Sequence, residues 1–541
     1  MYRIGQVAQP LTVADDALQR LGPSLEQHVG CDILDINPGT CLWSKTVHER
    51  LKPRRHILVE PDEKLYRPFL LPLLNTPDSK YKLVPKSGIV WAHLQTVLSQ
   101  QHLPDQPRIP RGDSRLEEKN NTLLVLVNLG FWPMKQYRGF DSMAGLVLYQ
   151  FMSACRTRSL FQRYGRVRFL VWTNDEERRQ ILPRDVYLRR KASTEMEIAF
   201  EELNEVASTT VQTGANQRGP DYDKKQGKAV LDRMQKAGIT TPPGRESVLM
   251  QKLLGKLPES DGKGPWSISK KRVEAIEAME KAVESGKIKK YVPSGEKFTP
   301  EYRKLRTMLI LREHSERRDQ RVRDALDKYI QLMEMHKDVV SRRKAGEDAT
   351  NLQEQLEKQK EQWAVDFELL TEDMQTRALY MLDNYRAIAC DPPLLFYDRR
   401  SYEPLLVKPE EFYPPHPMCL LDFQPAVNWP TLRDNYKDGS NRDILEYVVG
   451  TFFHLPTQSV KKALKSLWPG AYEWIVERCP SLTDPHRGGA LDLDSLSVRT
   501  ISKEMIEEIV TAWSTWPFRP SKHEVISKMG GAGFDPDSDP T

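Results

Sequence analysis

Short apolar segments alternate with amphipathic ones along residues 11–200, and this alternation constrains the fold more than any other feature of the chain. The apolar segments are rich in Val, Ile and Leu and are bounded by Gly, Pro, Asn or charged residues, as expected of strands buried on both faces. The amphipathic segments carry apolar residues at helical spacing. Repeated strand–helix–strand units predict a doubly wound α/β sheet. The strand-like segments are residues 31–37 (CDILDIN), 54–62 (RRHILVEPD), 121–129 (NTLLVLVNL) and 166–173 (RVRFLVWT).

The rest of the chain divides by composition. With 541 residues the chain is longer than one hydrophobic core usually organises. Strand-like sequence stops near residue 205 and returns at 418–423, which indicates an insertion between them. The insertion is first rich in Gly, Lys and Gln, then charged with apolar residues at helical spacing. The predicted parts are an α/β core (1–205), an insertion (206–385, with 206–300 largely disordered and 301–385 a helical hairpin), a return to the sheet (386–428), a helical C-terminal domain (429–527) and a flexible tail (528–541).

Charge and cysteine usage narrow the possible functions. The net charge of +5 permits contact with phosphate backbones without requiring it. The six cysteines stand far apart with no C-x-x-C pair, which argues against a metal site or a disulfide framework and for a reducing compartment. The longest apolar runs, such as 123–127, are too short to cross a bilayer, so no membrane partner is expected. Nothing suggests a symmetric interface, so a monomer is predicted.

A turn of small residues follows the first strand-like segment and opens a helix. It spans residues 35–44, with Pro38 and Gly39 at its centre. Such a turn lets the backbone approach a ligand closely, and the helix N-terminus adds partial positive charge. About twenty residues later Glu60 ends the second strand, where an acid can accept hydrogen bonds from both hydroxyls of a ribose. Together they predict a nucleoside-type site for NAD or S-adenosylmethionine, whereas the turn alone could be a plain loop.

The turn resembles the E-x-G-P-G-T-G-x-L-T signature of the rRNA adenine N(6)-dimethyltransferases. Residues 35–44 read DINPGTCLWS. Asn37 and Cys41 replace two glycines, at positions where that family leaves room for methionine and ribose. The resemblance implies the class I S-adenosylmethionine-dependent methyltransferase fold, a Rossmann-like sheet, with S-adenosyl-L-methionine as cofactor. The cofactor-binding residues that it implies are Asp35, Asn37, Gly39, Cys41, Glu60 and Asn128.

Two further segments resemble motifs of this family. Residues 128–131 read NLGF, in the slot where adenine N(6)-methyltransferases carry N-L-P-Y. The resemblance implies that Asn128 accepts from the exocyclic amine of an extruded adenine and that Phe131 stacks on the base, so these two are the predicted catalytic residues. The plain alternative is an asparagine at a strand end and a phenylalanine packed on the next helix. Residues 411–418 (EFYPPHPM) resemble the family's F-x-P-x-P-x-V segment, which implies that Phe412 borders the target-base pocket.

Three segments resemble the branch of this family that serves as the fungal mitochondrial transcription factor. They are residues 164–172, 189–200 and 513–520. The resemblance implies a partner of the single-subunit mitochondrial RNA polymerase that helps to recognise and melt promoter DNA, and it implies a mitochondrial location. The N-terminus shows no clear transit peptide, because acidic residues such as Asp15 come early.

Arginines and aromatic residues are interleaved between residues 156 and 191. Cations track phosphates and aromatic rings stack on unpaired bases, so this segment is a candidate nucleic-acid surface. The alternative is a solvated helix face beside core aromatics. The residues predicted to contact nucleic acid are Arg163, Arg166, Arg168, Arg189, Arg190 and Phe412.

Three functions follow from these observations, and whether the chain is an enzyme stays open. The first is a mitochondrial transcription factor that binds nucleic acid with a methyltransferase fold. The second is an active rRNA adenine N(6)-dimethyltransferase, supported by Glu60, Asn128 and Phe131. The third is a non-catalytic protein of the mitochondrial ribosome. Loss of two loop glycines favours the transcription factor and the ribosomal protein over the active enzyme. Segments 164–172 and 513–520 favour the transcription factor over the ribosomal protein.

Overall fold

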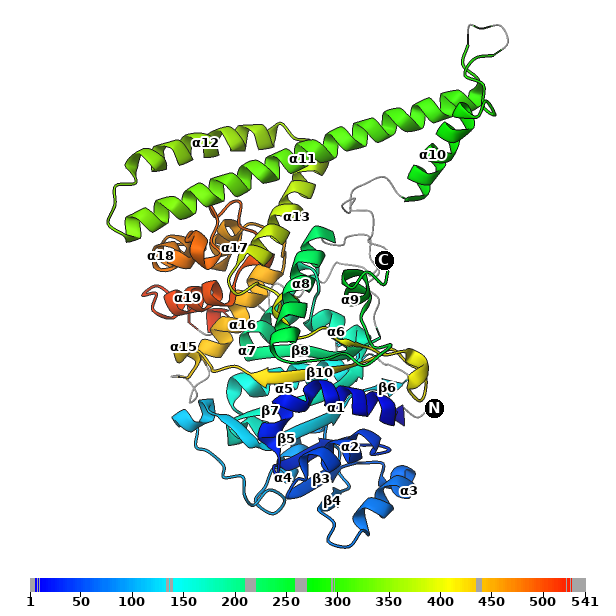
Figure 1. Ribbon diagram of the computed structural model, residues 1–541. Helices are drawn as coiled ribbons and strands as arrows, with labels where there is room; N and C mark the ends of the chain where they lie inside the picture. The colour runs from blue at the N-terminus through cyan, green and yellow to red at the C-terminus, as the bar shows by residue number, and fades with distance from the viewer. Residues whose placement is uncertain are drawn as a thin grey trace.

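The apolar strand-like segments form the centre of an eight-stranded sheet in the computed structural model (Figure 1). The structure describes the chain except residues 1–4, 7, 9, 133–135, 137–139, 210–219, 258–269, 293–294, 296, 434–439, 522, 526 and 528–541. All residues of the central strand β2 are buried, because helices cover both faces of the sheet. The strands are β2 (Asp32–Ile36), β3 (Arg55–Val59), β4 (Tyr81–Val84), β5 (Lys119–Asn128), β7 (Arg166–Asn174), β8 (Phe200–Ser208), β9 (Leu405–Leu406) and β10 (Met418–Pro425).

The strand order of this sheet is β4-β3-β2-β5-β7-β10-β8-β9. β10 runs antiparallel to both β7 and β8, and the other neighbouring strands are parallel. Numbered in chain order, the parallel strands from β2 to β8 follow the doubly wound order 3-2-1-4-5-6, with β10 between the last two. The predicted doubly wound α/β sheet is therefore confirmed. The order reverses between β2 and β5, so a ligand crevice is expected at the carboxyl ends of these strands.

Alternate residues of a strand point to opposite sides of the sheet, and here both sets are apolar, so helices cover both faces. The helices of the α/β domain are α1 (Leu11–Leu25), α2 (Leu42–Leu51), α3 (Glu63–Leu74), α4 (Trp91–Val97), α5 (Met143–Thr157), α6 (Asp175–Ile181) and α7 (Lys191–Ala199). Val125 and Phe169 lie in the core that α4 and α5 cover. Leu124 and Trp172 lie in the core on the other face, under α1 and α2. A separate two-stranded ribbon pairs β1 (Gly5–Gln6) with β6 (Phe131–Trp132).

The segment 206–300 contains helices, so the expectation that it is largely disordered is wrong where the structure describes it. Val230 and Met234 of its first helix are buried in the core under α1. These residues lie four apart on one helix face, and the surrounding Lys, Gln and Gly conceal them in the average composition. Residues 210–219 and 258–269 of this segment lie outside the described ranges. The helices are α8 (Pro220–Lys236), α9 (Val248–Leu253) and α10 (Lys270–Glu284).

The segment 301–385, predicted as a helical hairpin, contains two paired helices and a third that leads back to the sheet. The helices are α11 (Pro300–Lys344), α12 (Thr350–Glu368) and α13 (Glu372–Ala389). Trp363 of α12 packs on Tyr329 of α11, with ring centroids 5.2 Å apart, and its Nε1 donates to the main-chain oxygen of Ala325 (2.9 Å). The first turns of α11, with α10 beside them, stand away from the sheet, at the upper right of Figure 1.

The C-terminal helices pack around a core of their own, which includes the buried Trp513. This part follows the short helix α14 (Phe396–Arg399) and strand β10. The tail 528–541, predicted to be flexible, lies outside the described residues. Of the helices that the structure describes, none has the length and apolar character to span a bilayer. The C-terminal helices are α15 (Pro430–Arg433), α16 (Ser440–Phe453), α17 (Val460–Leu467), α18 (Ala471–Arg478) and α19 (Lys503–Ser514).

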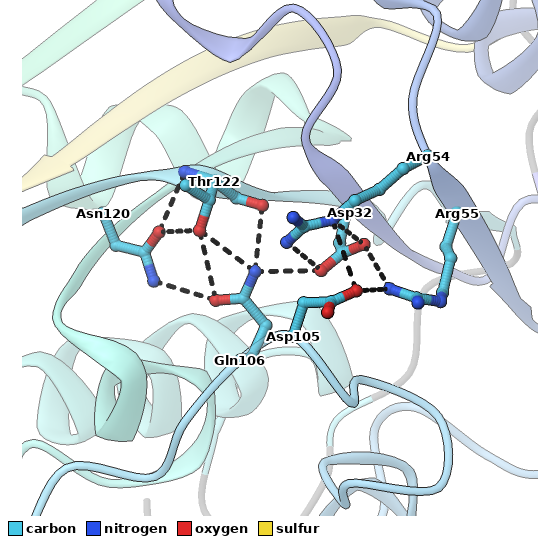
Figure 2. A network of polar contacts seen from close by, with 7 residues as sticks. All are labelled: Asp32, Arg54, Arg55, Asp105, Gln106, Asn120 and Thr122. Atoms are coloured by element: carbon cyan, nitrogen blue, oxygen red, sulfur yellow. Dashed lines mark hydrogen bonds and ion pairs between the residues drawn. The ribbon is translucent and has the colours of Figure 1, made fainter.

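A buried polar network fixes the amino end of β2, opposite the expected ligand crevice (Figure 2). Asp32 is fully buried, and its two carboxylate oxygens accept from Nε and Nη2 of Arg54, both at 2.8 Å. Gln106 also donates to this carboxylate (2.9 Å) and to the main-chain oxygen of Thr122 at 3.0 Å. The network therefore joins the lead-in to β3, the 103–106 turn and β5 around one buried charge.

Candidate functional site

The two predicted motifs meet where the strand order reverses. Asn37 directly follows β2, and Asn128 is the last residue of the neighbouring strand β5. The carboxyl ends of two parallel neighbours lie at the same edge of a sheet, so residues 91 positions apart in the chain come into contact. This is the place where doubly wound sheets bind nucleotides.

The loop after β2 keeps a glycine-like backbone without two of its glycines. Asn37, Gly39 and Cys41 all have φ of 57°, in the left-handed region. These are the three positions at which the methyltransferase signature has glycine. Asparagine tolerates this region, but a Cβ there costs roughly 1–2 kcal/mol for most residues. All three positions therefore have a backbone conformation that favours glycine, although Asn37 and Cys41 carry side chains.

Asn37 closes the gap between the two motifs. Its side-chain amide donates to the main-chain oxygen of Asn128 at 3.2 Å, and both residues are buried. The side chain therefore links the loop after β2 to the end of β5. A ligand that entered between these two strand ends would have to displace this hydrogen bond.

Glu60, the predicted ribose acid, lies beside the loop as expected but is fully buried. Its Oε2 accepts from the main-chain N–H of Gly39 (3.1 Å) and its Oε1 from that of Asp62 (2.9 Å). Each carboxylate oxygen thus already has a donor from the chain. The Glu60 carboxylate therefore holds the loop against the end of β3. Ribose hydroxyls could reach this carboxylate only if it became exposed.

Asp35, also predicted to bind the cofactor, instead faces a stack of rings that the sequence motifs did not reveal. Its carboxylate lies 3.2 Å from Nε2 of His56, whose Nδ1 lies 3.1 Å from Nδ1 of His48. Tyr81 stacks on both histidines, with centroids 4.1 and 4.8 Å apart. Burial, followed by the neighbouring His56, lowers the pKa of His48 to about 4. The His48 ring is therefore neutral at physiological pH. The contact of Asp35 with His56 links β2 to β3.

Cys41 lies in the predicted loop, but its side chain packs away from Asn128. It contacts the apolar cluster of Leu58 and Leu70, between β3 and α3. Burial raises the pKa of its thiol far above the ordinary value, so the group stays protonated. Of the two substituted glycine positions, only Asn37 therefore reaches across the site.

The predicted base motif lies beside this closed loop. The Asn128 side-chain oxygen accepts from the main-chain N–H of Gly130 (3.0 Å), and Phe131 is half-buried against the sheet core. A Cβ at Gly130 would lie 2.3 Å from Cε of Met418, the first residue of β10. A residue with a Cβ at this position would require the flexible end of the Met418 side chain to move. No local sequence signal could have paired residues so far apart in the chain.

Most of the predicted nucleic-acid arginines are engaged inside the protein. Arg168 and Arg189 are buried, so their assignment to an exposed nucleic-acid surface is wrong. Arg168 forms a two-pronged ion pair with Asp422 (2.8 and 2.7 Å), and Arg189 pairs with Glu197 at 2.5 Å. Each arginine is neutralised by a carboxylate inside the protein. Asp422 lies too far from Arg168 in the sequence for a local pattern to predict this pair.

The other predicted contact residues are dispersed. Arg166 is half-buried and donates to Glu201 (2.7 Å), and Arg163 donates to the Leu160 main-chain oxygen at 2.9 Å. Phe412 is buried against Trp172, with centroids 5.7 Å apart, so it lines the core and not an open base pocket. Arg190 alone of this set is exposed. These residues do not form one basic surface.

Acid pH is expected to destabilise the α/β domain through His28. Burial, and then the charge of Arg168, lower the pKa of His28 from 6.5 to about 4. Between these values the unfolded chain binds the proton and the folded chain does not, so stability falls as the pH drops from 6.5 towards 4. We expect a loss of roughly 1–3 kcal/mol in the free energy of unfolding.

Urea unfolding at pH 7 and pH 5, followed by tryptophan fluorescence, measures this loss, with His28→Gln as the control. The variant removes the titrating group, so its stability should depend less on pH over this window. Equal pH dependence of the two proteins would exclude His28 as the cause.

Known proteins add no assignment to this site. The chain matches no protein-family model and no curated protein. Within the part of the chain that the structure describes, no group of three or more His, Cys, Asp and Glu side chains is placed to hold a metal ion.

Proposed function

We propose that the protein is a mitochondrial transcription factor that binds nucleic acid on a methyltransferase-like sheet without transferring methyl groups. The observation that supports the absence of methyl transfer is the hydrogen bond from the Asn37 side-chain amide to the Asn128 main-chain oxygen, which links the ends of β2 and β5 where the strand order reverses. The burial of Glu60 supports the same conclusion, because a ribose cannot reach a fully buried carboxylate.

The placement of the motifs supports the methyltransferase origin of the sheet. The signature loop joins β2 to α2, the NLGF segment ends β5, and the segment 411–418 leads into β10. Each motif thus stands at the element that the resemblance implies. The single-subunit mitochondrial RNA polymerase and promoter DNA are the proposed partners, and the mitochondrion is the proposed location, all from the resemblance of residues 164–172, 189–200 and 513–520.

Restoring one glycine tests whether Asn37 closes the site. We expect no micromolar binding of S-adenosylmethionine to the wild-type protein in calorimetry and a gain of about tenfold or more in affinity for Asn37→Gly. Glycine adopts the left-handed backbone at this position without a Cβ, so the loop should keep its shape.

Cys41→Gly is the matched control, since it restores a glycine at the same φ but removes a side chain that packs away from the site. It should bind no better than the wild type. A gain in both variants would point to loop flexibility in place of a specific block by Asn37.

An active rRNA adenine N(6)-dimethyltransferase is the second candidate, because the structure brings Glu60, Gly39 and Asn128 to one edge of the sheet. Micromolar binding by the wild type that Glu60→Ala abolishes would establish this candidate. For the transcription factor, run-off synthesis from a linear promoter by the mitochondrial RNA polymerase should rise with added protein and need no S-adenosylmethionine. Absence of stimulation would refute that assignment.

A further inference from the structure

Described residues on the two sides of the loop between α10 and α11 pair with each other at the far end of the long helix. Tyr291 and Phe298 pair as an antiparallel bridge, and Val292 donates its main-chain N–H to the Lys297 oxygen at 2.8 Å. Thr299 caps α11 by accepting from the main-chain N–H of Tyr302 (3.3 Å). The paired residues are thus fixed to the first turn of α11, at the end that stands away from the sheet (Figure 1).

Three aromatic rings lie in contact here, two from the loop and one from α11. Tyr291 and Phe298 stack with centroids 5.1 Å apart and 22° between their planes, and the ring of Tyr302 lies 5.2 Å from Phe298, tilted by 42°. Tyr291 is 45% exposed. Part of the Tyr291 ring is therefore accessible to a planar partner.

Cations surround the stack. Lys290 lies 5.6 Å from the Tyr291 ring and Arg306 lies 5.3 Å from the Phe298 ring. Residues 287–306 contain seven lysines and arginines and only two glutamates, an excess equal to the net charge of +5 of the whole chain. No described carboxylate pairs with these seven cations, all of which are exposed. They are Lys287, Lys289, Lys290, Lys297, Arg303, Lys304 and Arg306.

The rest of α11 behaves differently. Further along the helix, several exposed cations have acidic partners, as in Arg317 with Glu313 at 2.5 Å and Lys328 with Asp366 at 2.8 Å. Others, such as Arg321, Arg342 and Arg343, form no ion pair with a described carboxylate. Paired charges of this kind are typical of a solvated helix face. Residues 287–292 and 297–306, the aromatic–basic tip, differ from the rest of α11 because none of their cations has a described carboxylate partner and because aromatic rings lie among them.

We propose that the aromatic–basic tip binds single-stranded nucleic acid. Its lysines and arginines meet the phosphates, and an unpaired base stacks against the exposed part of the Tyr291 ring. Duplex DNA offers the phosphates but no free base face, so the exposed ring selects single strands. The proposal deepens the proposed function by naming the surface and its ligand, and it rests on that function for its setting.

Fluorescence anisotropy with the full-length protein tests this proposal. The probes are labelled oligouridine, oligothymidine and a duplex, which separate RNA from DNA and single from double strands. Lys287, Lys289 and Lys290 to alanine should weaken single-strand binding about tenfold or more at low salt and lower the salt slope by about 2. Tyr291→Leu, which keeps an apolar side chain, should weaken it about fivefold or more, but should leave any duplex binding unchanged.

The matched control removes three exposed arginines from the same helix. Arg321, Arg342 and Arg343 to alanine delete the same charge away from the tip, the last two at the other end of a 45-residue helix. This control should change affinity less than about twofold. Equal losses in tip and control variants, unchanged binding in the tip variants, or equal binding of duplex and single strand would each overturn the proposal.

The two proposals can fail separately. Oligonucleotide binding that depends on the tip, without stimulation of the polymerase, would refute the transcription factor and support the tip. Stimulation of the polymerase that the tip variants leave intact, together with unchanged oligonucleotide binding, would refute the tip alone.

Discussion

Replacing Arg168 with alanine is expected to lower the free energy of unfolding by about 3–5 kcal/mol. The substitution leaves the buried Asp422 carboxylate without its two-pronged partner. It also removes the hydrogen bonds from the guanidinium to the main-chain and side-chain oxygens of Ser24, both at 2.8 Å, which tie the end of α1 to β7 and β10. Urea unfolding followed by tryptophan fluorescence measures this change, since Trp172 lies in the same strand.

Two comparisons separate a structural arginine from a nucleic-acid contact. Arg190→Ala removes an exposed arginine of the same predicted set and should change stability by less than about 0.5 kcal/mol. The double change Arg168→Met with Asp422→Leu removes both buried charges and should cost less than Arg168→Ala alone. If Arg168→Ala left stability unchanged and reduced only oligonucleotide binding, the structural role would be refuted.

Asp32→Ala is expected to cost about 3 kcal/mol or more of the free energy of unfolding, for a related reason. The Asp32 carboxylate in Figure 2 is fully buried, and its removal takes a hydrogen-bond acceptor from both Arg54 and Gln106. The cluster spans three segments, so its loss loosens the amino end of the sheet. Differential scanning calorimetry and urea unfolding should both report the change.

Asp105→Ala is the matched control for Asp32, because Asp105 belongs to the same network but is exposed at its rim, beside Arg55. Water can replace this carboxylate, so a much smaller loss is expected. Asp32→Asn should fall between the two, since it keeps the shape and loses the charge. Similar losses for Asp32→Ala and Asp105→Ala would show that burial does not set the strength of this network.

The sheet could be predicted from the sequence because each strand carries its own signal. Runs such as residues 123–127 are apolar throughout, and a strand covered on both faces requires this whatever its neighbours are. The positions of the Gly39 turn and of Glu60 could also be predicted, because each comes directly after a strand-like segment. Local patterns therefore located the candidate site and the residues around it.

The state of the site could not be predicted, because it depends on contacts between distant segments. Asn37 and Asn128 meet only through the register of β2 and β5, and Gly130 contacts Met418, which lies far away in the sequence. The prediction that Arg168 contacts nucleic acid was wrong for the same reason, because its carboxylate partner Asp422 lies 254 residues later in the chain. A cluster of charges in the sequence carries no information about which of them the fold neutralises.

The position of β10 governs the order in which the protein can assemble during synthesis. β8 ends at Ser208, yet β10, which separates it from β7, is complete only at Pro425. At 5–20 residues per second the ribosome needs roughly 10–40 s to supply the missing strand. During that interval the facing edges of β7 and β8 have no strand to pair with, and the helices of the insertion emerge first. The nascent chain is therefore vulnerable to edge-to-edge aggregation until its last central strand arrives.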